Sequence, residues 1–281
     1  MKLTPKKKSL LLTLLLAVTT PIALFMAGIS DALTVPRYQI SRADFPQLKI
    51  DKPLKFALIT DLHSCFYGEG QAEIFDVLQR EQPDAVLLVG DIYDDKLPPK
   101  HTDALLSRFK NTFNAYYVSG NHELYLPPEQ YAELERRMAG YGIKMMHGRE
   151  ATLPGSNVHL FGVTDPVREA DYRRDLVSTG TAAQADNFNI LLSHRPELIH
   201  EYQQYPFHLI VSGHAHGGQW RIPFLLNGLI APEGFFPKYG GGEYRFDNSR
   251  LIVSRGLARE STPNVPRVYN KTEVVMIELK P

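Results

Sequence analysis

The feature that most constrains this fold is a series of short apolar segments, each followed directly by polar residues that often bind metals. The segments have the length and composition of strands buried on both faces, and amphipathic stretches typical of helices separate them. The expected strands are residues 54–60, 85–89, 115–119, 189–193 and 208–212, and the expected helices are 73–82, 102–111 and 128–142. This alternation predicts a layered α/β sandwich with parallel central strands and helices packed outside. Later apolar runs, "VHLFGVT", "RLIVS" and "EVVMIEL", predict a second set of strands.

The residues that follow the strands are carboxylates, imidazoles and one amide. They are Asp61, His63, Asp91, Asp94, Asn121, His122, His194, His214 and His216. Ligands of open α/β sheets bind beyond the carboxyl ends of the strands, so we expect these side chains to meet at one rim. Burying them without partners would be costly, whereas two divalent cations would suit the mixed nitrogen and oxygen donors. The pattern therefore favours a two-metal site.

The order of these motifs is similar to that of a known family. D-x-H, G-D-x-x-D, G-N-H-[DE], a later His and G-H-x-H follow one another between Leu54 and Gln219, as in the calcineurin-like metallophosphoesterase superfamily. "LSHRP", "GHAHGGQ" and the closing "VSRGL…EVVMIEL" resemble its YkuE/YaeI-like branch of membrane-associated or exported phosphodiesterases. The resemblance implies a four-layer α/β/β/α sandwich over residues 51–281.

The resemblance also implies a role for each residue at the rim. One metal would be held by Asp61, His63 and His216, with Asp91 bridging, and the other by Asn121, His194 and His214. His122 would be the catalytic histidine, and Asp94 would pair with it and raise the pKa of its imidazole. The residues leave the identity of the metals open between Mn, Fe and Zn.

Asp95 departs from the pattern of the superfamily's protein phosphatases, which carry a phosphate-gripping arginine at this position. The departure argues against a phosphoprotein phosphatase and leaves the grip on the substrate unassigned. Arg195, next to His194, is a candidate for it. Glu123 could support the metal ligands or cap a helix, and the sequence leaves both open.

The N-terminus predicts a membrane anchor over residues 1–30. Lysines at positions 2, 6, 7 and 8 precede an uncharged, mostly apolar stretch from Ser9 to Ser30. This predicts one transmembrane helix, with the N-terminus in the cytoplasm and the catalytic domain outside. Cleavage of a signal peptide near Gly28 and Ser30, followed by export, is the alternative. Residues 31–50 are then expected to be a linker.

Composition narrows the possible partners. The 281 residues carry 31 basic and 31 acidic side chains, so no overall basic field favours nucleic acid. The segment from Gln219 to Gly242 is unusually apolar; we expect it to tuck over the second sheet, although contact with a bilayer or with an acyl chain is the alternative.

These observations predict a membrane-anchored phosphoesterase that hydrolyses phosphodiester or phosphoanhydride bonds through a hydroxide activated by two metals. The expected substrate is a phosphorylated small molecule or lipid, such as a lipid-linked or cell-envelope phosphate compound. One alternative is a pyrophosphohydrolase of a UDP-linked glycolipid of the lipid A type, whose substrate would lie at the cytoplasmic leaflet. Another is a catalytically inactive scaffold with this fold, which is disfavoured because every matching position is filled.

Overall fold

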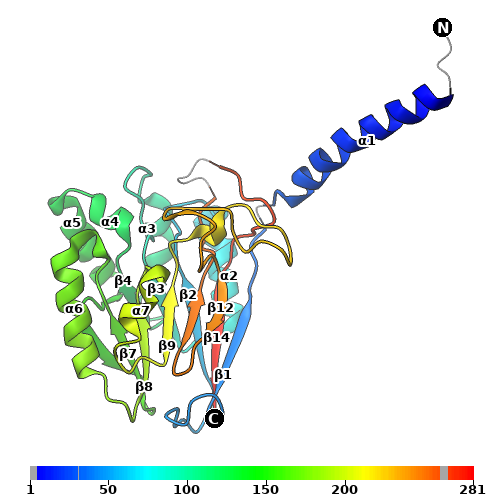
Figure 1. Cartoon of the computed structure of the whole chain (residues 1–281). Helices are drawn as coiled ribbons and strands as arrows, with labels where there is room; N and C mark the ends of the chain where they lie inside the picture. Colours follow the sequence, from blue (N-terminus) through cyan, green and yellow to red (C-terminus); the bar gives the residue numbers. More distant parts are fainter. Residues whose placement is uncertain (1–4, 31, 260–264) are drawn as a thin grey trace.

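The chain forms two mixed sheets that pack face to face, with helices on both outer faces (Figure 1). The computed structural model describes residues 5–30, 32–259 and 265–281, and it leaves the side chains at positions 7, 8, 10 and 11 undescribed. Within the described residues each of the two large sheets has six strands, and a separate two-stranded ribbon joins β10 (Ile230–Ala231) to β11 (Gly234–Phe235).

The first sheet has the strand order β1-β14-β2-β3-β4-β5 in the described part of the chain. Its central strands β2, β3, β4 and β5 are parallel, and β14 runs antiparallel to β2. The bounds are β1 Arg37–Ser41, β2 Leu54–Ile59, β3 Ala85–Val89, β4 Ala115–Val118, β5 Lys144–Met145 and β14 Val275–Lys280.

The second sheet has the order β12-β13-β9-β8-β7-β6, again among the described residues. Strands β13, β9, β8 and β7 are parallel, and the edge strands β12 and β6 run antiparallel to their neighbours. The bounds are β6 Arg149–Thr152, β7 Val158–Gly162, β8 Phe188–Leu192, β9 Leu209–Ser212, β12 Gly242–Arg245 and β13 Arg250–Val253.

The helices occupy the connections and the N-terminus. They are α1 Pro5–Gly28, α2 Ala72–Glu81, α3 Lys100–Leu106, α4 Asn121–Tyr125, α5 Pro128–Gly140, α6 Glu169–Ala182 and α7 Ile199–Tyr202, with 3₁₀ turns at Glu69–Gln71, Pro166–Arg168, Pro196–Leu198 and His216–Gly218.

Three apolar clusters show why the layers stack in this order. The first lies between the sheets and joins β2 side chains such as Phe56 and Leu58 to β8 side chains such as Ile190. The second joins the outer face of the first sheet to α2, α3 and α5, and the third joins the second sheet to α6 and α7. Because alternate side chains of a strand point to opposite faces, each central strand contributes to two clusters. The predicted four-layer α/β/β/α sandwich is confirmed.

Several local predictions differ from the structure. "EVVMIEL" was expected in the second set of strands, but β14 lies in the first sheet between β1 and β2. The expected linker over 31–50 contains β1, which pairs with β14 and buries Ile40, while Phe45 and Leu48 are buried beyond it. The mostly polar sequence Arg-Tyr-Gln-Ile-Ser of β1 has only one buried side chain, so its pattern did not reveal a strand.

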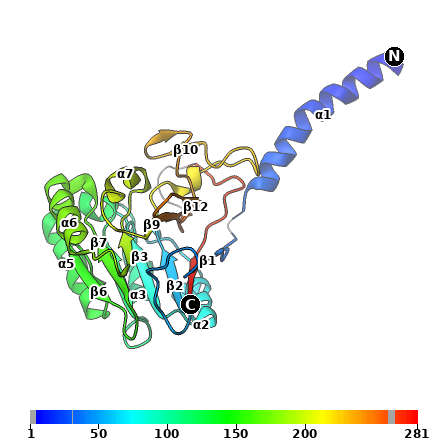
Figure 2. The same ribbon diagram turned by 60° about the horizontal axis from the view of Figure 1, so that its bottom comes forward.

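Helix α1 extends away from the rest of the molecule in both views (Figures 1 and 2). Apart from the half-buried Phe25, its large apolar side chains from Leu12 to Met26 are 53–61% exposed. Among the described residues, no helix has the length and apolar character needed to cross a bilayer. The predicted transmembrane helix is therefore not supported; residues 1–4 of the predicted anchor, and the side chains at 7, 8, 10 and 11, lie outside the described part of the chain.

Candidate metal centre

Both sheets deliver the predicted ligands to one end of the sandwich. Asp61 and His63 follow β2, Asp91 follows β3, and Asn121 begins α4 directly after β4. His194 follows β8, and the 213–218 segment after β9 carries His214 and His216. The predicted ligands are all buried, each being at most 6% exposed. The parallel alignment of the central strands is what brings residues so distant in sequence together.

The backbone at the ligands is unusual. Asp61, His63, Asp91, His214 and His216 all have φ between +48° and +66°. Side chains other than glycine rarely adopt this left-handed region, and such outliers gather at functional sites. Gly90, at φ +80°, must remain a glycine because a Cβ there would overlap the ring of His194. The loops are thus held in strained conformations that aim the ligands inward.

The first group of candidate ligands is Asp61, His63, Asp91 and His216, whose donor atoms lie within 4.8 Å of one another. The His63 Nε2 lies 3.6 Å from the Asp91 Oδ2, and the His216 Nε2 lies 3.7 Å from the Asp61 Oδ1. Atoms at these separations are too far apart to hydrogen-bond well but close enough to share one cation. This group matches the predicted first metal site.

The second group is Asp91, His194 and His214, again within 4.8 Å. The His194 Nε2 lies 3.1 Å from the Asp91 Oδ2, and the rings of His194 and His214 have centroids 5.0 Å apart. Asp91 belongs to both groups, which is the arrangement that a bridging carboxylate requires. The adjacent Asn121 side chain is buried, and its Oδ1 has no hydrogen-bond partner among the described residues.

Unpartnered buried atoms test whether these residues fit metal ions. Within the described part of the chain, six predicted ligands each present one such atom: His63 Nε2, Asp91 Oδ2, Asn121 Oδ1, His194 Nε2, His214 Nδ1 and His216 Nδ1. Buried polar atoms are normally satisfied, so a cluster of unsatisfied donors and acceptors calls for a further group. Imidazole nitrogens with carboxylate and amide oxygens suit divalent transition metals. The donor set fits the predicted two-metal site.

The electrostatics of the pocket also favour cations. Burial opposes protonation of His194, but the Asp91 and Asp61 carboxylates outweigh burial and raise the pKa of its imidazole to about 10. Burial, with the neighbouring cationic side chains, holds the pKa of His214 and of His216 well below the usual value. The field of the two carboxylates thus attracts positive charge, while His214 and His216 stay neutral and able to donate a lone pair.

Partners behind the ligands fix their ring orientations. The His194 Nδ1 lies 3.0 Å from the carbonyl oxygen of Val89, so Nδ1 donates and Nε2 faces the pocket. The His63 Nδ1 lies 2.8 Å from the Asp94 Oδ2, which leaves its Nε2 toward Asp91 in the same way. Hydrogen bonds of this kind select the tautomer of a metal-binding histidine. Asp94 was predicted to pair with His122, but its shorter contact is with His63.

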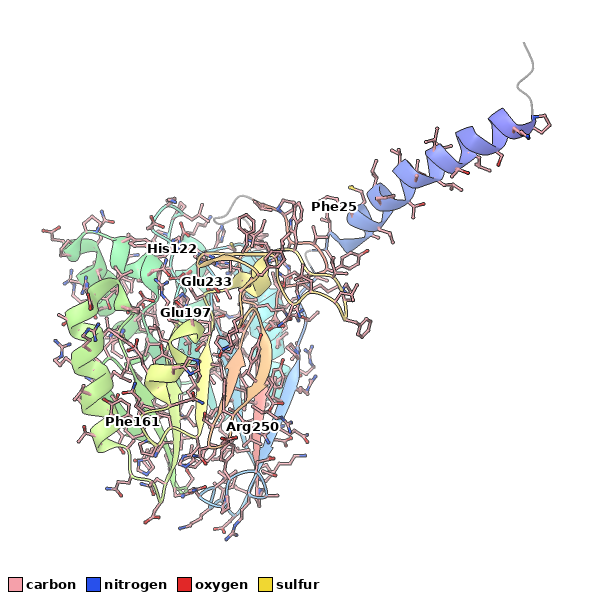
Figure 3. All side chains as sticks on the ribbon, in the orientation of Figure 1. Phe25, His122, Phe161, Glu197, Glu233 and Arg250 are labelled. Atoms are coloured by element: carbon pink, nitrogen blue, oxygen red, sulfur yellow. The ribbon has the colours of Figure 1, made fainter. Side chains whose placement is uncertain are left out.

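His122, the predicted catalytic histidine, lies at the edge of the pocket with its side chain 12% exposed. Its Nδ1 lies 2.6 Å from the Asp95 Oδ1 and 3.5 Å from the Asp94 Oδ2. The nearest carboxylate is therefore Asp95, which the sequence marked only as a departure from the phosphatase pattern. The ring of His122 packs edge-on against that of His63, with centroids 4.4 Å apart. Figure 3 shows His122 at the end of the molecule opposite Arg250.

Glu123 joins the two loops that carry Asp91 and Asn121. Its buried carboxylate accepts hydrogen bonds from the backbone N–H groups of Asp91, Ile92, Tyr93 and Gly120 at 2.7–3.0 Å. Burial and the nearby Asp91 carboxylate raise the pKa of Glu123 to about 7. The sequence left Glu123 open between a helix cap and a support for the ligands; in the structure it does both.

Arg195, which was predicted to bind the substrate's phosphate group, already has hydrogen-bond partners within the protein. Its Nε and Nη2 donate to the two carboxylate oxygens of Asp165 at 2.7 and 3.2 Å, and its Nη1 lies 2.8 Å from the His214 Nε2. The pairing leaves the His214 Nδ1 facing the pocket. In this geometry Arg195 orients the candidate ligand His214, and most of its donors are unavailable to a phosphate group.

The predicted tucked position of the apolar segment after the rim is wrong. Ile222, Phe224, Leu225, Phe235 and Phe236 are 51%, 107%, 85%, 74% and 65% exposed. The β10–β11 ribbon within this segment lies on the side of the molecule from which α1 leaves (Figure 2). Near the base of α1, the rings of Phe25 and Trp220 contact edge to face at 5.5 Å. The base of α1 therefore lies against the start of this segment.

A two-sheet sandwich that gathers Asp, Asn and His ligands around one shared carboxylate defines a metallophosphoesterase. The family described as "Calcineurin-like phosphoesterase" matches residues 54–218, more than half of the chain. The chain belongs to this family, and the similarity supports a hydrolase of phosphoric esters.

Curated relatives place the chain near the predicted branch. It is 29% identical to a metallophosphoesterase of Campylobacter jejuni over 265 residues, covering 92% of this chain and 67% of that protein. It is 25% identical to the phosphodiesterase YaeI of Escherichia coli over 233 residues, covering 81% of this chain and 82% of that protein. The UDP-2,3-diacylglucosamine pyrophosphatase LpxG of Chlamydia trachomatis is 24% identical over 222 residues, or 74% of this chain and 64% of LpxG.

Among solved structures, the NAD nucleotidase NadN of Haemophilus influenzae has a similar fold, with a TM-score of 0.51 and 16% identity. The similarity covers 74% of this chain and 46% of the NadN chain. At this level of identity the comparison supports the sandwich fold alone.

Proposed function

We propose that this protein hydrolyses phosphodiester or phosphoanhydride bonds with two divalent cations held by Asp61, His63, Asp91, Asn121, His194, His214 and His216. The observation that carries the proposal is the set of unpartnered buried atoms on these residues, most of which belong to two groups that share Asp91. Two cations in these positions would supply Lewis-acid charge and a nucleophile derived from water at neutral pH.

The side chains around the cations would position and protonate the substrate. His122 lies beside the first group, and its Nδ1 is taken up by Asp95, so its Nε2 is left for the phosphoryl or leaving-group oxygen. A histidine held this way can donate a proton to a departing alkoxide. Asp94 and Glu123 act behind it, since they orient His63 and the backbone around Asp91.

We further propose that the substrate is an envelope or lipid-linked phosphate compound. The exposed apolar side chains of 222–236 support this, because they follow directly after the ligand loop and could contact acyl chains. Figure 3 shows Glu233, from the same segment, at the end of the molecule where His122 lies. The exposed apolar side chains of α1 are consistent with a position beside a lipid surface.

A second candidate is a pyrophosphohydrolase of a UDP-linked glycolipid, favoured by the similarity to LpxG. Its substrate would lie at the cytoplasmic leaflet, so the side of the membrane on which the catalytic domain lies separates this candidate from one with a substrate on the outer side. Alkaline phosphatase and fluorescent-protein fusions at the C-terminus distinguish the two placements, because the first reporter is active only outside the cytoplasm and the second only within it.

The central experiment measures hydrolysis of bis(p-nitrophenyl) phosphate by the purified full chain after metal removal and reloading with Mn, Fe or Zn. Activity that depends on metal and falls at least about 100-fold in His122→Ala would support the proposal. A wild type that is inert with every metal and equal to His122→Ala would instead favour the scaffold. p-Nitrophenyl phosphate in parallel reports the preference for diesters over monoesters.

The substrate class is tested with a panel of lipid-linked and nucleotide-linked phosphates. We expect Phe224→Ser/Phe235→Ser to lose activity on the lipid-linked compounds while retaining activity on bis(p-nitrophenyl) phosphate. Val177→Ser is the matched control, since Val177 is 55% exposed on α6. Equal activity of both variants on every lipid-linked compound would contradict the apolar contact.

A further inference from the structure

Arg267 is a buried guanidinium with unused donors. The residue is 8% exposed, and its Nε donates to the carbonyl oxygen of Ala258 at 2.8 Å. The terminal nitrogens Nη1 and Nη2 are buried, and neither has a hydrogen-bond partner among the residues that the structure describes. Burying a charged group without an acceptor is costly, so this arrangement calls for an anion or for ordered water.

The two segments that hold Arg267 pack against the first group of metal ligands. On one side, Leu257, next to the Ala258 acceptor, donates its N–H to the carbonyl oxygens of Thr60 and Asp61 at 3.1 Å. On the other side, Val268 N–H donates to the Gln219 carbonyl oxygen, and the Asn270 side chain donates to the His216 carbonyl oxygen at 2.7 Å. Arg267 therefore lies between the loop of Asp61 and the loop of His216.

The surroundings of Arg267 include one ligand of the first group. Burial lowers the pKa of Arg267, whereas the nearby Tyr67 hydroxyl and Asp61 carboxylate favour its charged form. A guanidinium held between the loops of two candidate ligands is placed to meet a substrate that the cations would hold. Arginine is suited to this task because its planar fork matches two phosphoryl oxygens.

Other arginines near the pocket have their donors occupied. Arg195 is paired with Asp165 and His214, and Arg255 is paired with Glu273. We propose that Arg267, rather than Arg195, binds a non-bridging oxygen of the substrate's phosphoryl group through Nη1 and Nη2. Arg267 would thus take the phosphate-binding role that belongs, in the superfamily's protein phosphatases, to an arginine at the position of Asp95. This inference rests on the proposed function.

The competing arrangement is a purely structural Arg267 bonded to buried water. Gln219 Oε1 and Asn270 Oδ1, on the adjoining segments, also lack partners in the described part of the chain, and waters could join them to the guanidinium. A structural role predicts lost stability without any change in the binding of phosphate. The two roles are therefore separable by experiment.

The test compares Arg267→Lys and Arg267→Gln with the wild type, all as metal-loaded full chain. Arg250→Lys is the control, because Arg250 is also a buried arginine but lies at the opposite end of the sandwich, paired with Asp44 and Glu243 (Figure 3). Calorimetric titration with inorganic phosphate is the first readout. We expect both Arg267 variants to keep their metal content and to bind phosphate about 10- to 100-fold more weakly, with Arg267→Gln the weaker.

Kinetics with bis(p-nitrophenyl) phosphate and a crystal structure of the wild type with bound phosphate are the second and third readouts. We expect kcat/KM to fall in both Arg267 variants but not in Arg250→Lys, and the phosphate to lie within hydrogen-bond distance of Nη1 or Nη2. The crystal structure decides the matter even where a variant fails to fold. Unchanged phosphate affinity in folded variants, or a phosphate bound away from Arg267, would overturn the inference about Arg267 but leave the proposed function standing. A wild type that binds neither metal nor phosphate would overturn the proposed function with it.

Discussion

Asp95 Oδ1 lies 2.6 Å from His122 Nδ1. Asp95 therefore orients the catalytic candidate His122, although the adjacent Asp94 was predicted for that role. Asp94 Oδ2 lies 2.8 Å from His63 Nδ1 and 3.5 Å from His122 Nδ1. The two adjacent carboxylates thus serve different histidines. One orients a metal ligand and the other orients the residue expected to donate a proton.

This division predicts distinct defects for the two amide variants. Asp95→Asn should reduce kcat about 10-fold or more with little change in metal content, because His122 loses the acceptor that fixes its ring. Asp94→Asn should weaken metal binding, because it disturbs His63. Steady-state kinetics with elemental analysis of each variant measure both effects. The division is wrong if Asp95→Asn behaves as wild type while Asp94→Asn alone lowers kcat at full metal content.

Asp91 should control both cations, because it belongs to both ligand groups. We expect Asp91→Asn to retain less than half of the wild-type metal, whereas His216→Ala should affect mainly the first site and His194→Ala mainly the second. Inductively coupled plasma mass spectrometry after dialysis gives the number of ions per chain. Equal metal content in the three variants would contradict a shared carboxylate.

Glu123 should matter for activity although it does not face the pocket. In Glu123→Gln the amide NH₂ would meet backbone N–H groups, so some of the four hydrogen bonds would be lost. We expect a 10- to 100-fold loss of metal affinity or activity, about that seen when groups behind metal ligands are removed. Glu135→Gln, a change at a partly exposed position of α5, is the control. Wild-type metal affinity and activity in Glu123→Gln would show that the loops hold without this carboxylate.

His147 should make the stability of the fold depend on pH. Its Nε2 accepts the N–H of Ser119 at 2.8 Å, and burial lowers the pKa of the imidazole to about 4. Between about pH 4 and 6.5 the unfolded chain therefore binds more protons at this residue than the folded chain does. The contribution of His147 to the free energy of unfolding is complete above about pH 6.5 and is lost as the pH falls toward about 4. One proton gives a slope of at most about 1.4 kcal/mol per pH unit.

The measurement is urea unfolding of the wild type and His147→Gln at several pH values from 4.5 to 7.5. Gln keeps an acceptor for the Ser119 N–H but does not titrate, so the free energy of unfolding should depend less on pH in the variant. His200→Gln, a change on α7, is the control for a histidine with no such bond in the described structure. Identical pH dependence of wild type and His147→Gln would contradict the low pKa.

Much of the layered fold and the ligand set could be predicted from the sequence. The central strands are continuous apolar runs, and each ends in a residue type that local sequence identifies, so neither depends on distant contacts. The edge strand β1 and the outer helix α6 were harder to predict. β1 has one buried side chain, and α6 buries only Tyr172, Asp175, Leu176, Thr179 and Gly180, so its apolar pattern is weak and the helix was not predicted.

By itself the sequence determined which residues are candidates for the chemistry, because strand ends and metal-binding residue types are both local properties. Only the tertiary structure decided the pairings. Asp94 and Asp95 are adjacent residues of the same type. The backbone of their loop, which hydrogen-bonds to Glu123, determines which histidine each carboxylate contacts. The burial of Arg267 beside the first ligand group and the exposure of Phe224 likewise depend on how distant segments pack. Packing between segments far apart along the chain sets these partners, and no local pattern encodes it.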